Sequence, residues 1–215
     1  VNLAYNLTER GFKVLLIDFD PQANASTHLG ITTKDKEYTI YDTISTEFHK
    51  GVPMTNAIVK VHGIYLIPSS KKLAGLEGQC VNAPGKEFVL RDQLSYLPSS
   101  KIDYILIDCP GKPGFLTNNA ICASTDIITT VQAEFLSLAS LQEIMITIKV
   151  IRERLAVSPE FFGVVVTMFD KRRCLNKEVL ETVQEKFPDK ILSPPIRDNI
   201  ALAESPSHGL PISVY

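Results

Sequence analysis

Short apolar runs rich in valine and isoleucine recur along the chain. Six of them span residues 14–17, 64–67, 104–107, 126–131, 163–168 and 190–192. The runs are continuous and do not alternate with polar residues, which is typical of strands covered on both faces, as in a parallel sheet. The pattern therefore predicts six buried strands.

Helical patterns separate these runs. The sequence predicts a first helix that Gly11 ends, a second over residues 88–97 before Pro98, a long one from Phe135 to Leu155, and one that Asn176 caps and that reaches Phe187. Residues 32–63 form the least regular stretch, with one short helix expected near its middle. Because strand and helix alternate, we expect residues 1–215 to form a single α/β domain with a doubly wound, mostly parallel sheet and helices on both faces.

Composition narrows the possible functions. Apolar residues make up 45% of the chain and charged residues 21%, and the net charge is −2, so we expect a folded protein with no overall attraction to nucleic acid. No apolar run approaches the roughly 20 residues that span a membrane. The four cysteines and four histidines are scattered, which predicts no metal site built from them and suits a reducing cytoplasm.

Acidic residues directly follow two of the predicted strands. Asp18 and Asp20 follow the run at 14–17, and Asp108 follows the run at 104–107. An apolar strand that ends in aspartate is the Walker B pattern, in which the carboxylate holds Mg²⁺ beside nucleotide phosphates. Aspartate also caps simple turns, so Asp108 alone leaves both interpretations open.

Five sequence blocks, taken in order, are more specific. They read VLLIDFDPQANAS at 14–26, IDCP at 107–110, VQAEF at 131–135, VTMFD at 166–170 and ESPSHGLPI at 204–212. The first resembles the signature of ParA, Soj and MinD-type ATPases, and the last is similar to the plasmid and chromosome partition branch. The resemblance extends over essentially the whole chain and implies an ATP-dependent partition switch with a P-loop NTPase-like fold.

The resemblance also implies roles for individual residues. In this family ATP and Mg²⁺ are sandwiched between two protomers of a homodimer. Asp20 matches the carboxylate that orients the attacking water, Asp108 matches the Mg²⁺-linked carboxylate, directly or through water, and Asp18 supports the metal or its loop. The segments that match the loops around the nucleotide base contain Thr167, Met168, Asp170, Pro195, Ile196 and Arg197.

A short basic run could bind DNA locally, although the net charge of the chain gives no overall attraction to nucleic acid. Lys171, Arg172 and Arg173 are consecutive, and Arg172 matches a family position that contacts DNA without sequence preference. Asp198 and Ala201 stand where partition ATPases often carry arginines, and a charge run is also typical of a plain solvated surface. The resemblance further implies a ParB-like partner that stimulates hydrolysis, and a cytoplasmic, nucleoid-associated location without membrane contact.

One family element does not occur in these 215 residues. No GxxxxGK[ST] motif is present, and the resemblance puts the Walker A loop and the first strand directly before residue 1. We therefore expect the natural sequence to continue beyond both ends, and the 215 residues alone to be inactive. The alternatives are a MinD-like membrane-cycling ATPase, an iron–sulfur carrier, which the lack of a CxxC motif disfavours, and a nucleotide-free interaction module if the gene lacks Walker A.

Overall fold

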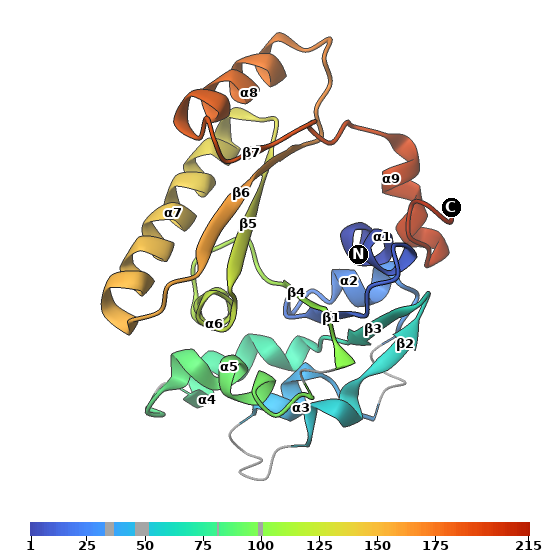
Figure 1. The fold of residues 1–215 in the computed structure, drawn as a ribbon, viewed down its shortest axis with the longest axis vertical. Coiled ribbons are helices and arrows are strands. Elements are labelled where there is room, and N and C mark those ends of the chain that lie inside the picture. The colour runs from blue at the N-terminus through green and yellow to red at the C-terminus, as the bar shows by residue number, and fades with distance from the viewer. Residues whose placement is uncertain (33–36, 46–51, 81, 99–100) are drawn as a thin grey trace. The chain divides into compact units, whose positions relative to one another are not determined.

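The computed structural model describes residues 1–215 except 33–36, 46–51, 81 and 99–100 (Figure 1). These residues form two compact units. Unit 1 comprises Val1–Pro110, Phe115–Ala123 and Ala201–Tyr215, and unit 2 comprises Gly111–Gly114 and Ser124–Ile200. Within the irregular stretch at 32–63, the connections expected at 33–36 and 46–51 lie outside the described residues, and the short helix is present as α3 (Ile40–Ile44).

Unit 1 contains a four-stranded sheet in the order β2-β3-β1-β4. Its strands are β1 (Val14–Asp18), β2 (Val59–Val61), β3 (Ile64–Ile67) and β4 (Tyr104–Asp108). The central strand β1 pairs in parallel with both β3 and β4, whereas β2 pairs antiparallel with β3. All five residues of β1 are buried.

Helices cover both faces of this sheet (Figure 1). They are α1 (Asn2–Glu9), α2 (Asn24–His28), α3, α4 (Leu76–Cys80), α5 (Val89–Leu94) and α6 (Phe115–Ala123). Because side chains of a strand alternate between faces, Leu15 and Ile17 pack with α3 to α6, while Val14 and Leu16 pack with α1 and α2. The strand β1 thus connects two apolar cores.

The last described segment returns to unit 1. It contains α9 (Ile200–Glu204) and a 3₁₀ turn, η6 (Ser205–His208), which lies against α2. Gly30 and Gly209 both have φ of +70°, and a Cβ atom on Gly209 would lie only 3.2 Å from the Cα atom of Gly30. His28 Nε2 also hydrogen-bonds to the carbonyl oxygen of Leu210 at 3.1 Å. The C-terminal segment is therefore fixed to α2.

Unit 2 contains a parallel three-stranded sheet in the order β5-β6-β7. Its elements are β5 (Asp126–Gln132), α7 (Phe135–Leu155), β6 (Glu160–Thr167), α8 (Cys174–Lys186) and β7 (Ile191–Leu192). Gly163 lies where β6 and β7 approach closely, because a Cβ atom there would overlap the carbonyl oxygen of Lys190. None of the helices in the described ranges is long and apolar enough to cross a membrane.

The α/β class, the mostly parallel strand order and all six predicted strands are confirmed. Three details differ from the expectation. The strands form two sheets, and β2 was not predicted because its sequence, VKV, is too short for an apolar run. The expectation that strands are buried on both faces is wrong for β4 and β5, where Tyr104 is 44% and Ile128 45% exposed. Both strands lie at the edge of their sheet.

The predicted capping role of Asn176 is also wrong. Helix α8 begins at Cys174 and its N-cap is Arg173, so Asn176 lies inside the first turn. Its side chain is buried and serves other segments: Oδ1 accepts from the amide of Asp170 at 2.8 Å, and Nδ2 donates to the carbonyl oxygen of Ala133. These contacts replace the capping hydrogen bond.

Candidate functional site

The loop after β1 is held by the side chain of Asp18. This carboxylate is fully buried, and its Oδ2 atom accepts hydrogen bonds from the amide of Ser26 at 2.7 Å and from the Ser26 hydroxyl at 2.6 Å. Ala23, which lies between Asp18 and Ser26 in the sequence, adopts a left-handed conformation with φ of 55°, which is uncommon for a residue with a side chain. The loop that presents Asp20 is thus tied to both β1 and α2.

A second serine fixes the same loop from the neighbouring strand. Ser69 is fully buried and follows the carboxyl end of β3. Its amide donates to Ser26 Oγ at 3.1 Å, and its hydroxyl donates to the carbonyl oxygen of Asp20. The side chain of Asp20 itself accepts from the amide of Gln22 at 2.8 Å. Ser69 is not among the site residues predicted from the sequence, although its position after a parallel strand is a usable signal.

Asp108 lies beside Asp18 at the carboxyl end of the adjacent strand. The two residues are paired in the register of β1 and β4, and the amide of Phe19 donates to the carbonyl oxygen of Asp108 at 2.7 Å. Asp108 keeps access to solvent. The structure thus brings together the three carboxylates that the sequence singled out.

Burial and mutual repulsion make this cluster unfavourable for negative charge. Burial raises the pKa of Asp18 to about 6, the hydrogen bonds from Ser26 oppose that rise, and the charge of Asp108 adds to it. Burial also raises the pKa of Asp108, with a further contribution from Asp20. Burial, together with the charges of Asp108 and Asp20, raises the pKa of the Cys109 thiol to about 12. A cation placed here would relieve these costs.

Positive charge does approach the cluster from the amino-terminal end of α1. Val1, the N-cap of α1, lies close enough to Asp108 and Asp18 to interact with both carboxylates. The start of a helix carries a partial positive charge and free amide groups, which suits phosphate. Carboxylates at two strand ends beside a helix start therefore offer ligands for a divalent cation and a site for an anion.

No group of three or more histidine, cysteine, aspartate or glutamate residues within the described ranges is arranged to hold a metal ion. Magnesium, however, is commonly held by one or two carboxylates together with water and substrate phosphates. The clustered acids with raised pKa values fit that arrangement, and the metal role of Asp108 stays a prediction.

In unit 2, residues 167–170 and 195–198, the two segments expected to surround the nucleotide base, lie next to each other. Strand β6 ends at Thr167, and Met168 follows with a left-handed φ of 53°. Beyond it, the amide of Phe169 donates to the carbonyl oxygen of Ile196 at 3.0 Å, and the amide of Asp198 donates to Phe169 at 3.1 Å. The segments at 167–170 and 195–198 are thus paired, as a joint role requires.

Asp170 binds the basic run that follows it. Arg172 Nε lies 3.0 Å from Asp170 Oδ1 and Arg172 Nη2 lies 2.8 Å from Oδ2, while Arg173 Nε lies 3.9 Å from Oδ2. The hydrogen bonds from the side chain and amide of Arg172 hold the pKa of Asp170 well below its usual range. The bidentate pair fixes Arg172 in place.

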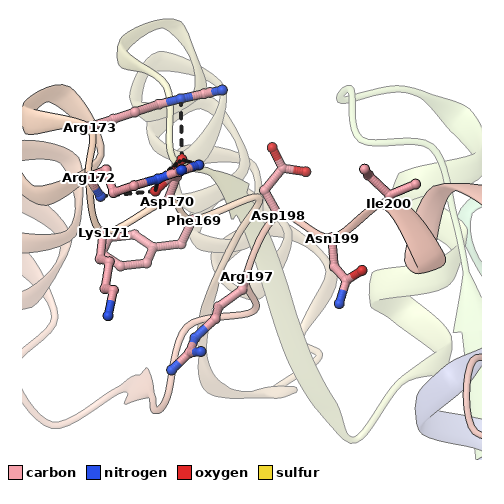
Figure 2. A pocket seen from close by; sticks show the side chains of 9 residues that line it. All are labelled: Phe169, Asp170, Lys171, Arg172, Arg173, Arg197, Asp198, Asn199 and Ile200. Carbon is pink, nitrogen blue, oxygen red and sulfur yellow. Dashed lines mark hydrogen bonds and ion pairs between the residues drawn. The ribbon is translucent and has the colours of Figure 1, made fainter.

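These residues surround a pocket of about 520 Å³, here called the cationic pocket (Figure 2). It is lined by Phe169, Asp170, Lys171, Arg172, Arg173, Arg197, Asp198, Asn199 and Ile200. The structure thus places all three predicted DNA-contact residues, together with Asp170 and Arg197, in one pocket of unit 2.

Comparison with known proteins identifies the family. Residues 1–161 match the family described as "AAA domain". The whole chain is 37% identical to the sporulation initiation inhibitor protein Soj of Bacillus subtilis, covering 84% of that protein, and 36% identical to the chromosome partitioning protein ParA of Caulobacter vibrioides, covering 80% of it. The chain belongs to the ParA/Soj family of partition ATPases.

A solved structure agrees with this ParA/Soj fold. It is cobyrinic acid a,c-diamide synthase from Mycobacterium smegmatis, crystallised with a bound ATP analogue and magnesium. The TM-score is 0.82 at 29% identity, and the match covers 91% of this chain and 76% of that protein. The relatives and the solved structure thus agree on the fold.

Proposed function

We propose that this chain is the ATP-hydrolysing switch of a DNA partition system, with ATP and Mg²⁺ as its cofactors. One observation carries the proposal: Asp18, Asp20 and Asp108 cluster at the carboxyl ends of two adjacent parallel strands, beside the start of α1. In open α/β sheets, ligands bind at this position. The ATP analogue and magnesium bound to the M. smegmatis synthase support this assignment.

Each carboxylate has a distinct role in this proposal. Bound Mg²⁺ would neutralise charge on the phosphates during their transfer. Asp108, which keeps access to solvent, would hold that ion directly or through water. Asp18 is fully buried and its Oδ2 atom accepts two hydrogen bonds from Ser26, so it would order the loop. Asp20 is partly exposed and orients the attacking water.

In unit 2, Thr167, Met168, Pro195 and Ile196 keep the base-contacting role that the resemblance gives them. Asp170 and Arg197, for which sequence reasoning gave the same role, line the cationic pocket. We take residues 1–215, which form two compact units, as one functional ATPase domain.

The switch would act through assembly and DNA. ATP would stabilise a homodimer, and that dimer would bind DNA without sequence preference through Lys171, Arg172 and Arg173. A ParB-like partner would stimulate hydrolysis and release the dimer. The site of action is then the nucleoid in the cytoplasm. The family relatives that carry the names ParA and Soj support this scheme.

The test separates nucleotide binding from hydrolysis. In the full-length protein we expect Asp20→Ala to bind a fluorescent ATP analogue with nearly unchanged affinity, while ATP turnover falls by about 100-fold, because the water loses its positioning group. Asp189→Ala is the matched control, since Asp189 is exposed and lies in unit 2. Near-normal turnover in Asp20→Ala would remove Asp20 from the catalytic role.

A further inference from the structure

The cationic pocket is built from two segments that are far apart in sequence. Backbone hydrogen bonds from Phe169 to Ile196 and from Asp198 to Phe169 hold these segments together, and an isolated parallel bridge joins Phe169 to Arg197. As a result, Arg197 lines the same pocket as the basic run at 171–173 (Figure 2). The sequence alone predicts Arg197 in a loop around the nucleotide base, separate from the basic run.

The cations of the pocket are not equally free. Asp170 binds Arg172 through two hydrogen bonds of 3.0 Å or less to the guanidinium group and also attracts Arg173. Within the described part of the chain, neither Lys171 nor Arg197 forms an ion pair, and both are exposed. These two side chains therefore carry the positive charge that is most available to a ligand.

Their placement suits a phosphate group. In Figure 2 the side chains of Lys171 and Arg197 extend in the same direction, away from the pair between Asp170 and Arg172. Lysine offers a compact charge and arginine a planar fork of donors, and both bind phosphate oxygens well. The chain as a whole has a net charge of −2, so an anion is attracted to this pocket by local charge.

We propose that Lys171 and Arg197 together hold one phosphate of the DNA backbone, so that Arg197 is a DNA-contact residue and not part of the base site. This inference rests on the proposed function, because it names a further residue of the DNA surface. Asp170 acts as a positioning residue, since it keeps Arg172 beside the pocket and reduces the net charge there.

The experiment measures how binding of a fluorescent duplex depends on salt, using the full-length protein with Mg²⁺ and a non-hydrolysable ATP analogue. Each lost phosphate contact lowers the slope of log K against log salt by about 0.9. We expect the slope for Arg197→Gln to be lower by this amount. When the salt rises from about 50 to 200 mM, the DNA affinity of this variant should then fall by a factor about three times smaller than that of the unsubstituted protein. Arg197→Lys keeps the charge and should keep the slope.

The matched control is Arg154→Gln, which removes an exposed arginine of α7 in the same unit and should leave the slope unchanged. Affinity for a fluorescent ATP analogue is measured in parallel. Weaker nucleotide binding by Arg197→Gln with an unchanged salt slope would overturn the inference and return Arg197 to the base site. If the unsubstituted protein binds no DNA, the proposed function fails as well, whereas normal DNA binding with an unchanged slope refutes this inference alone.

Discussion

Replacing Asp18 by asparagine removes a charge that the interior disfavours. Burial raises the pKa of Asp18 from 3.8 to about 6 in the folded protein. The unfolded chain therefore releases this proton at lower pH than the folded one, and the contribution of Asp18 to stability falls as pH rises between these two values. One pKa unit corresponds to about 1.36 kcal/mol, so the loss amounts to about 3 kcal/mol above pH 6.

Urea unfolding without nucleotide or Mg²⁺ measures this effect at several pH values. The difference in unfolding free energy, Asp18→Asn minus unsubstituted protein, should increase by about 3 kcal/mol between about pH 3 and pH 7. Carboxylates that do not interact with Asp18 titrate alike in both proteins and cancel in the difference, whereas Asp108, which repels Asp18, contributes to it. A constant difference would refute the raised pKa, and a decreasing one would show that the hydrogen bonds from Ser26 outweigh burial. Asp189→Asn, at an exposed position, should give a flat profile.

Three further predictions address unit 2. Arg172→Ala exposes the carboxylate of Asp170 in the cationic pocket, so it should weaken ATP-dependent DNA binding equally for two duplexes of unrelated sequence; a loss for only one duplex would indicate base readout. Gly163→Ala should lower the free energy of unfolding by about 1–3 kcal/mol, because its Cβ would overlap the carbonyl oxygen of Lys190; Gly78→Ala, where the added Cβ meets nothing within 4 Å, should not destabilise. Asn176→Ala should cost about 1–3 kcal/mol in thermal unfolding, since a buried amide and carbonyl lose their partner, and a change below about 0.5 kcal/mol would contradict this.

The strands could be predicted from the sequence because their apolar runs are long enough to recognise. In β1 every residue is buried, so the run and the strand coincide. The apolar pattern does not predict how deeply a strand is buried, because burial also depends on the position of the strand in the sheet. The residues of β4 are as apolar as those of β1, yet β4 lies at a sheet edge and Ile105 is 39% exposed. Apolar composition alone carries no information about which strand is central.

The candidate site was predictable as far as it depends on strand ends. Asp18 and Asp108 follow two apolar runs, and parallel neighbours place their carboxyl ends together. The supporting residues could not be found this way. Ser69 and Asn176 act through hydrogen bonds to segments many residues away, and serine and asparagine are common in turns and caps for other reasons. The role of Arg197 likewise depends on the pairing of two distant loops.

The return of the C-terminal segment to unit 1 has a consequence for the order of synthesis. Unit 2 is almost continuous in sequence, at Ser124–Ile200, whereas unit 1 needs Ala201–Tyr215 to complete its packing on α2. Chains are made from the amino terminus, and domains generally fold as units while they emerge from the ribosome. The sheet of unit 2 can therefore form before α2, which carries Ser26, receives its final neighbours.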